Sequence, residues 1–172
     1  MIPYLASLEY YRAAVGGQSL PAVVPNRAQL APDLMLTVPV AGGSGTLKRF
    51  MSGRLSAREL EISQHGRWQH THLGALEAQL GRTPFWRHLE PSVAPLIAEA
   101  SGSLEELNEA LDAALKTFLD YETLLPELRE MATLNPGRTA AVAHRILRDA
   151  DPAAPYLVLV ARYGRDAIFA LV

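Results

Sequence analysis

The 172-residue chain contains no cysteine, and this absence excludes whole classes of site. Without a thiol it can form no disulfide, thiolate zinc site, iron–sulfur cluster or cysteine nucleophile. A domain of this length needs none of these to fold, because it buries roughly two thirds of the surface that its unfolded chain exposes. We therefore expect a single domain over residues 1–172, with no structural metal and no cofactor.

An excess of charge of one sign is also missing. The 16 basic and 18 acidic residues give a formal net charge of −2, which is not the strongly basic balance typical of nucleic-acid binders. No run approaches the roughly 20 apolar residues of a membrane span. The N-terminus has no basic segment followed by a long apolar core, so it does not resemble a signal peptide. These absences predict a cytoplasmic protein without a membrane span or a nucleic-acid partner.

The composition that remains is that of a globular protein, with 49% hydrophobic and 20% charged residues. We predict a mixed α/β fold, in which a small mixed or antiparallel sheet packs against several helices. Apolar spacing predicts helices over 7–14, 67–80, 84–90 with continuation to 100, 103–118, 124–131 and 140–148. The clearest start is at Ser103, where Glu106 completes a capping box. Strands are predicted over 34–40, 59–63 and 156–161. An apolar run over 167–172 would either pair with the last strand as a hairpin or follow it as a short packed segment.

The turn signals give weaker information. The glycines of residues 41–45 follow a predicted strand, as phosphate-binding loops do. However, neither a GK[ST] nor a GxGxxG pattern follows, so a plain loop is the favoured interpretation. Residues 135–137, Asn-Pro-Gly, predict a turn.

Three of the five histidines fall close together, at His65, His70 and His72. None of these pairs has the i, i+4 spacing with which a helix chelates a metal ion, so we expect no metal site. His72 lies four residues after Trp68, and the two would share a helix face. One hypothesis is that His72 acts as a general base, or that it donates a hydrogen bond to a phosphate or carboxylate. The alternative is that it packs beside Trp68 with its ring nitrogens satisfied, while His65 caps a turn.

Aromatic side chains accompany the histidines. Trp68, Phe85 and Trp86 would suit a platform for stacking a sugar or a base, while core packing is the alternative. Tyr10 belongs to a second aromatic group near the N-terminus, and buried tyrosine hydroxyls need partners. Serine catalysis has no support, because no GxSxG pattern occurs.

Several segments form an ordered set along the chain. They are Tyr4 with Tyr10-Tyr11, Leu36-Thr37-Val38-Pro39-Val40, residues 61–73 and 75–77, Thr83-Pro84-Phe85-Trp86, Leu107 to Leu111, and Arg162-Tyr163-Gly164. Taken together, these segments resemble the WbqC-like protein family. The chain departs from the family pattern where a long polar segment shrinks to residues 23–29, of which only Asn26 and Arg27 match. The usual polar C-terminal ending is also missing.

The resemblance implies a transferase that acts on an activated or amino sugar in bacterial surface polysaccharide (O-antigen) biosynthesis. In this hypothesis Tyr10, Asn26, Arg27, Trp68 and His65 bind the sugar or nucleotide sugar, and His72 is the catalytic base. Arg27 would clamp a phosphate or carboxylate.

The shortened polar segment supports a second hypothesis. The chain would then be a non-catalytic binding or interaction module that keeps the fold. In this hypothesis the residues 158–160 and 168–172 would form the edge of a homodimer.

Overall fold

The computed structural model describes residues 1–172 and confirms a mixed α/β fold with one two-stranded antiparallel sheet. The elements follow in the order α1 (Leu8–Val15), β1 (Arg27–Ala31), β2 (Leu34–Thr37), α2 (Gly43–Met51), η1 (Ala57–Glu59), α3 (Trp68–Leu80), α4 (Trp86–Ala98), α5 (Leu104–Leu119), α6 (Tyr121–Leu134), α7 (Pro136–Arg148), α8 (Tyr156–Tyr163) and η2 (Gly164–Leu171). Eight α-helices thus carry most of the fold, and the sheet is small.

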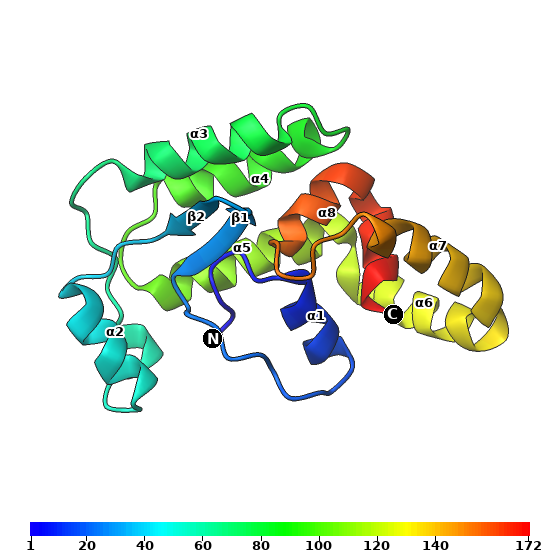
Figure 1. The fold of residues 1–172 in the computed structure, drawn as a ribbon, viewed down its shortest axis with the longest axis horizontal. Helices are drawn as coiled ribbons and strands as arrows, with labels where there is room; N and C mark the ends of the chain where they lie inside the picture. The colour runs from blue at the N-terminus through cyan, green and yellow to red at the C-terminus, as the bar shows by residue number, and fades with distance from the viewer.

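Helix α5 is the longest element, and it lies behind the hairpin and α1 in the view of Figure 1. Its leucines repeat at helical spacing and are buried, and α4 packs along it. Its start is the predicted capping box: the Ser103 hydroxyl accepts from the Glu106 N–H, and the Glu106 carboxylate accepts from the Ser103 N–H. Both donors would otherwise lack a partner inside the helix.

Replacing Ser103 with alanine should lower the free energy of unfolding by about 1 kcal/mol, because one capping acceptor is lost. Chemical denaturation followed by circular dichroism would measure the change. The matched control is Ser101→Ala, since Ser101 is exposed just before the cap. Equal stability of the two variants would contradict the capping role.

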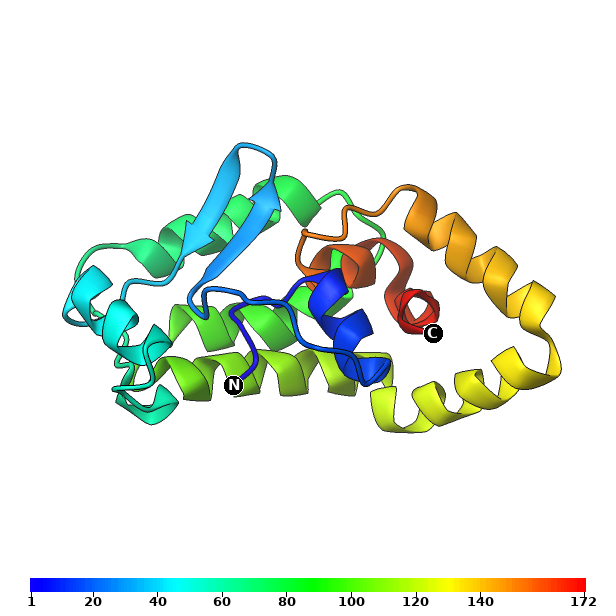
Figure 2. The ribbon, with the colours of Figure 1, turned by 60° about the horizontal axis from the view of Figure 1, so that its bottom comes forward.

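The β1–β2 hairpin stands beside α3, away from the α6–α7 pair at the other end of the molecule (Figure 2). Arg27 pairs with Thr37, and Ala28 pairs with Leu36. Leu30 and Leu36 point into the core. The hairpin thereby brings the segment that contains Asn26 and Arg27 next to α3. The sequence predicted β2 but not β1.

The predicted C-terminal strand pair is wrong. Residues 156–161 belong to helix α8, and residues 164–171 form the 3₁₀-helix η2. The apolar run Leu157–Ala161 fits a helix buried among α3, α4, α5 and η2 as well as it fits a buried strand, and periodicity alone does not separate the two. Residues 158–160 therefore present no strand edge with which a second copy could pair.

Three smaller predictions also need correction. Residues 43–45 open helix α2 instead of forming a loop, after Gly42 takes a left-handed conformation with φ of 77°. Residues 59–63 make only isolated bridges, in which Val40 pairs with Ile62 and Glu61 with Ser103. The predicted turn at 135–137 begins helix α7, with Pro136 in its first turn, where its missing N–H costs nothing.

Candidate functional site

His72 lies in the core, on the face of α3 that meets the hairpin. Only 4% of its surface is exposed. Its Nδ1 is 2.8 Å from the Tyr4 hydroxyl, a contact between residues far apart in the chain. Trp68 lies one turn earlier on α3, with its ring centroid 5.1 Å from that of His72 and the planes nearly perpendicular. The predicted shared face of Trp68 and His72 is therefore present, and Tyr4 completes the group.

Burial sets the charge of this group. Desolvation lowers the pKa of His72 to about 4, and a backbone hydrogen bond with Thr37 opposes the shift only in part. Burial also raises the pKa of Tyr4 far above its usual value. At neutral pH both side chains are therefore uncharged. The His72 ring is held by a hydroxyl on one side and by the backbone of β2 on the other.

Asn26 and Arg27 are neighbours in the chain with different surroundings. Asn26 is buried, and its amide nitrogen donates to the Val38 carbonyl oxygen at 2.6 Å, whereas its Oδ1 has no partner. The Trp68 indole N–H is likewise buried without a partner. Arg27 is exposed and pairs through its backbone with Thr37, the residue that contacts His72. The hairpin therefore places Arg27 near the His72 group without any contact between their side chains.

Arg27 lies at a groove of about 320 Å³ between the N-terminal segment and the hairpin. The walls include Tyr4, Val23 and Met35, and most of the lining is apolar. The Arg27 guanidinium takes part in none of the ion pairs of the structure. The groove thus offers the Arg27 cation, which makes no ion pair, beside an apolar wall, and Glu9 is the one acidic residue in its lining.

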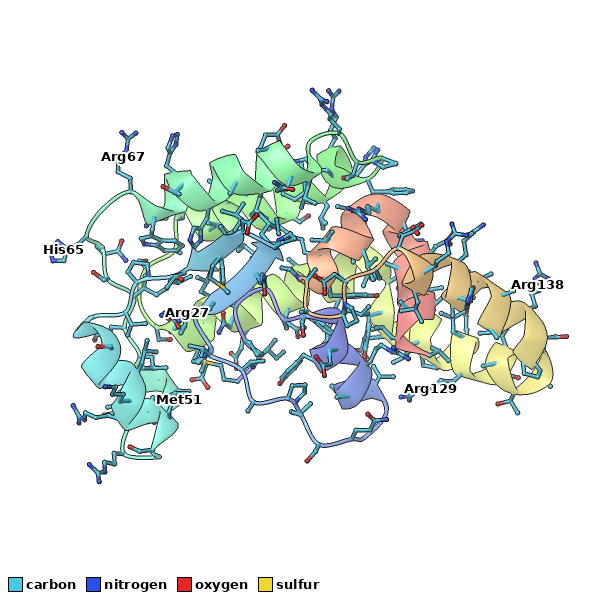
Figure 3. All side chains as sticks on the ribbon, in the orientation of Figure 1. Arg27, Met51, His65, Arg67, Arg129 and Arg138 are labelled. Carbon is cyan, nitrogen blue, oxygen red and sulfur yellow. The ribbon has the colours of Figure 1, made fainter.

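Two predicted binding residues lie elsewhere. His65 is exposed in the loop before α3 and points outward, far from Arg27 (Figure 3). Its backbone N–H donates to the Ser63 hydroxyl, as a turn residue would. Tyr10 lies on α1, and the burial of its ring and the charge of Asp112 on α5 raise its pKa. The structure therefore packs His72 and Trp68 together in the core, whereas Arg27 is the one predicted site residue that lines the groove, and His65 and Tyr10 lie apart from both.

Sequence reasoning missed a second polar group, centred on Asp112. The Tyr11 hydroxyl donates to Asp112 at 2.5 Å, and the Lys116 ammonium lies 2.7 Å from the same carboxylate. Lys116 also lies 5.4 Å from the centre of the Tyr121 ring. Burial first, and then the charge of Asp112, raises the pKa of Tyr11. Burial alone would lower the pKa of Lys116, but the hydrogen bond and the charge of Asp112 outweigh burial and raise this pKa.

A signal for this group was present in the sequence. Asn108 and Asp112 fall on the apolar stripe of α5, four residues apart, where a leucine would be expected. Buried polar side chains on such a stripe need partners from other elements. Asn108 donates to the Pro25 carbonyl oxygen at 3.0 Å, and Asp112 binds Tyr11. Both contacts tie α5 to the N-terminal part of the chain.

The histidine, aspartate and glutamate side chains form no group of three or more that could hold a metal ion. None of the helices combines the length and the apolar character that crossing a membrane requires.

Comparison with known proteins gives one family match. The model of the WbqC-like protein family matches residues 25–154, which include the hairpin, α3, and Asp112 with Lys116, whereas Tyr4 and Tyr11 lie before the matched range. No curated protein and no solved structure matches the chain. Because the family model covers well over half of the sequence, the chain belongs to the WbqC-like protein family.

Proposed function

We propose that the chain is a binding module that takes a small anionic ligand, such as a sugar phosphate, in the groove beside Arg27. The observation that carries the proposal is the state of His72, which is buried, uncharged and held by both Tyr4 and the Thr37 backbone. A general base must reach the proton that it removes. Here a core hydroxyl occupies Nδ1, so the geometry favours a packing role for His72.

The groove supplies what an anion needs. A guanidinium offers paired N–H donors that match phosphate or carboxylate oxygens, and Arg27 makes no internal ion pair that would compete. The apolar walls reduce the access of water and so strengthen the interaction. A volume of about 320 Å³ lies at the small end of the range for ligand sites, which suits a monosaccharide phosphate.

A transferase in the bacterial cytoplasm, acting on an activated or amino sugar in surface polysaccharide biosynthesis, is the second candidate. One observation favours it: Tyr4, which binds His72, lines the same groove as Arg27. If Tyr4 moved aside on binding, His72 could reach a hydroxyl or amine of the substrate. Removal of His72 would then abolish turnover while ligand binding persisted, whereas in a binding module it would change stability alone.

Replacing Arg27 with alanine should weaken the binding of glucose 1-phosphate about tenfold or more, because a charge-assisted hydrogen bond is worth about 1.5–3 kcal/mol. Arg27→Lys should retain part of the affinity, since it keeps the charge and loses the paired donors. Titration calorimetry, or chemical shifts of the hairpin amides, would measure both variants.

The matched control is Arg67→Ala, because Arg67 is an exposed arginine outside the groove (Figure 3). Its affinity should equal that of the parent. Equal losses in the two alanine variants would indicate a non-specific charge effect and would contradict the site.

A further inference from the structure

A second hollow, of about 590 Å³, lies where the start of α4, the end of α5 and the α8–η2 junction meet. Three aromatic side chains line it: Phe85, Phe118 and Tyr163. All three are partly exposed, and Phe85 keeps 37% of its surface accessible. Large aromatic side chains that remain accessible around a hollow are unusual for core packing, and they leave their ring surfaces available to a ligand.

The backbone fixes the aromatic wall in place. The Phe85 N–H donates to the Ala161 carbonyl oxygen at 2.9 Å, which ties the start of α4 to α8. Gly164 has φ of 56°, and a Cβ at that position would lie 2.8 Å from the Phe85 ring. The ring therefore rests directly on the Gly164 backbone, and only glycine permits that approach. Two segments far apart in sequence, 84–86 and 162–164, thereby build one rigid surface.

Polar groups surround the aromatic wall with balanced charge. Arg165 offers donors, Asp166 offers acceptors, Thr117 offers both, and His88 lies at the same hollow. Asp166 has one distant cationic neighbour, Arg145, at 4.0 Å, and most of its carboxylate is exposed. An anionic ligand would meet the Asp166 carboxylate, and a cationic ligand would meet Arg165. A neutral ring with several hydroxyls would use both residues.

We infer that this aromatic hollow binds a neutral hexopyranose unit, and that the site is separate from the Arg27 groove. The C–H groups on one face of a pyranose carry partial positive charge and would rest on the negative faces of Phe85 and Tyr163. The hydroxyls around the ring would bind Asp166, Arg165 and Thr117. The hollow lies within the size range of small-molecule sites and accommodates one or two sugar units.

Saturation-transfer-difference NMR with methyl glycosides of glucose, galactose and N-acetylglucosamine tests this site. We expect signals from the ring C–H protons of at least one glycoside. Phe85→Ala should weaken that binding about tenfold. Asp166→Asn should weaken it as well, and because Asp166 is exposed this variant keeps the fold. If Phe85→Ala fails to fold, Asp166→Asn decides alone: weaker binding supports the site, and unchanged binding overturns it.

The matched control is Met131→Ala, which truncates an exposed apolar side chain of α6 outside the hollow and should leave glycoside binding unchanged. The inference is overturned if no glycoside gives a signal, or if the signals survive both site variants. It is also overturned if uridine monophosphate shifts the residues of the hollow and the glycosides do not, since the platform would then take a base. Arg27→Ala should not change glycoside binding, which separates this test from that of the groove.

Discussion

Replacing Asp112 with alanine should lower the free energy of unfolding by about 3 kcal/mol. Removing one partner of a buried ion pair costs about 3–5 kcal/mol, and the lower end applies because Lys116 keeps 34% of its side chain exposed. The variant would leave the Tyr11 hydroxyl buried without an acceptor and Lys116 without its counter-charge. For a chain of this length, such a loss should lower Tm by about 6–12 °C.

Differential scanning calorimetry and urea denaturation at neutral pH would measure the change. Glu109→Ala is the matched control, because it removes an exposed carboxylate from the same helix and should shift stability by less than about 0.5 kcal/mol. Asp112→Asn should fall between the parent and Asp112→Ala, since the amide oxygen still accepts from Tyr11.

A double variant separates the ion pair from packing. Asp112→Leu combined with Lys116→Met removes both charges and restores apolar volume, so it should be more stable than Asp112→Ala. If Asp112→Ala were as stable as Glu109→Ala, the carboxylate would have no structural role at the junction of α1 and α5. That result would contradict the arrangement described here.

Local signals in the sequence predicted much of the helical part of the fold. The capping box at Ser103 and the leucine spacing after it correctly placed α5, and the spacing before Gly81 correctly placed α3. These signals work because hydrogen bonds and side-chain contacts within a helix join residues three or four apart. The family resemblance came from several motifs along the chain, and the family model confirms the family.

The C-terminal region could not be predicted in this way. Residues 156–161 are apolar on every side, and such a run has no period that separates a buried helix from a buried strand. The surrounding helices decide the outcome, because α8 is covered on several sides and all its backbone groups must be paired in the interior. That environment is formed by segments far away in the sequence, so the conformational propensity of residues 156–161 does not reveal it.

In the candidate site, too, local spacing could be predicted from the sequence, whereas contacts between distant residues could not. The spacing of Trp68 and His72 correctly placed them on one face of α3. The partner of His72 is Tyr4, 68 residues away, and the partner of Asp112 is Tyr11, 101 residues away. No local sequence pattern predicts such distant pairs. Yet these partners determine whether a histidine or an aspartate is available to a substrate. The polar interruptions at Asn108 and Asp112 show that partners exist, but do not identify them.

Acidification should destabilise the protein through His72. Its pKa is about 4 in the folded chain and about 6.5 when unfolded, so between these values the unfolded chain binds the extra proton. Stability is therefore complete above about pH 6.5 and falls as the pH drops toward 4. From about pH 6.5 to 4.5 we expect a loss of roughly 2 kcal/mol, somewhat below the limit of about 1.36 kcal/mol per pH unit.

Urea denaturation at a series of pH values measures this loss, and two variants assign it. His72→Gln should be less stable than the parent at neutral pH, and its stability should change less below pH 6.5 because no buried imidazole remains to be protonated. His65→Gln is the matched control, since it makes the same substitution at an exposed histidine outside the core.

The result also bears on the two proposed functions. A parent-like pH profile in His72→Gln would show that protons are taken up elsewhere, and that His72 is less buried than its contacts with Tyr4 and Trp68 require. His72 would then be accessible to a substrate, and the transferase candidate would gain support. A flattened profile would instead show that the imidazole is kept uncharged in the core, as expected if His72 joins α3 to the N-terminal segment and the hairpin of a binding module.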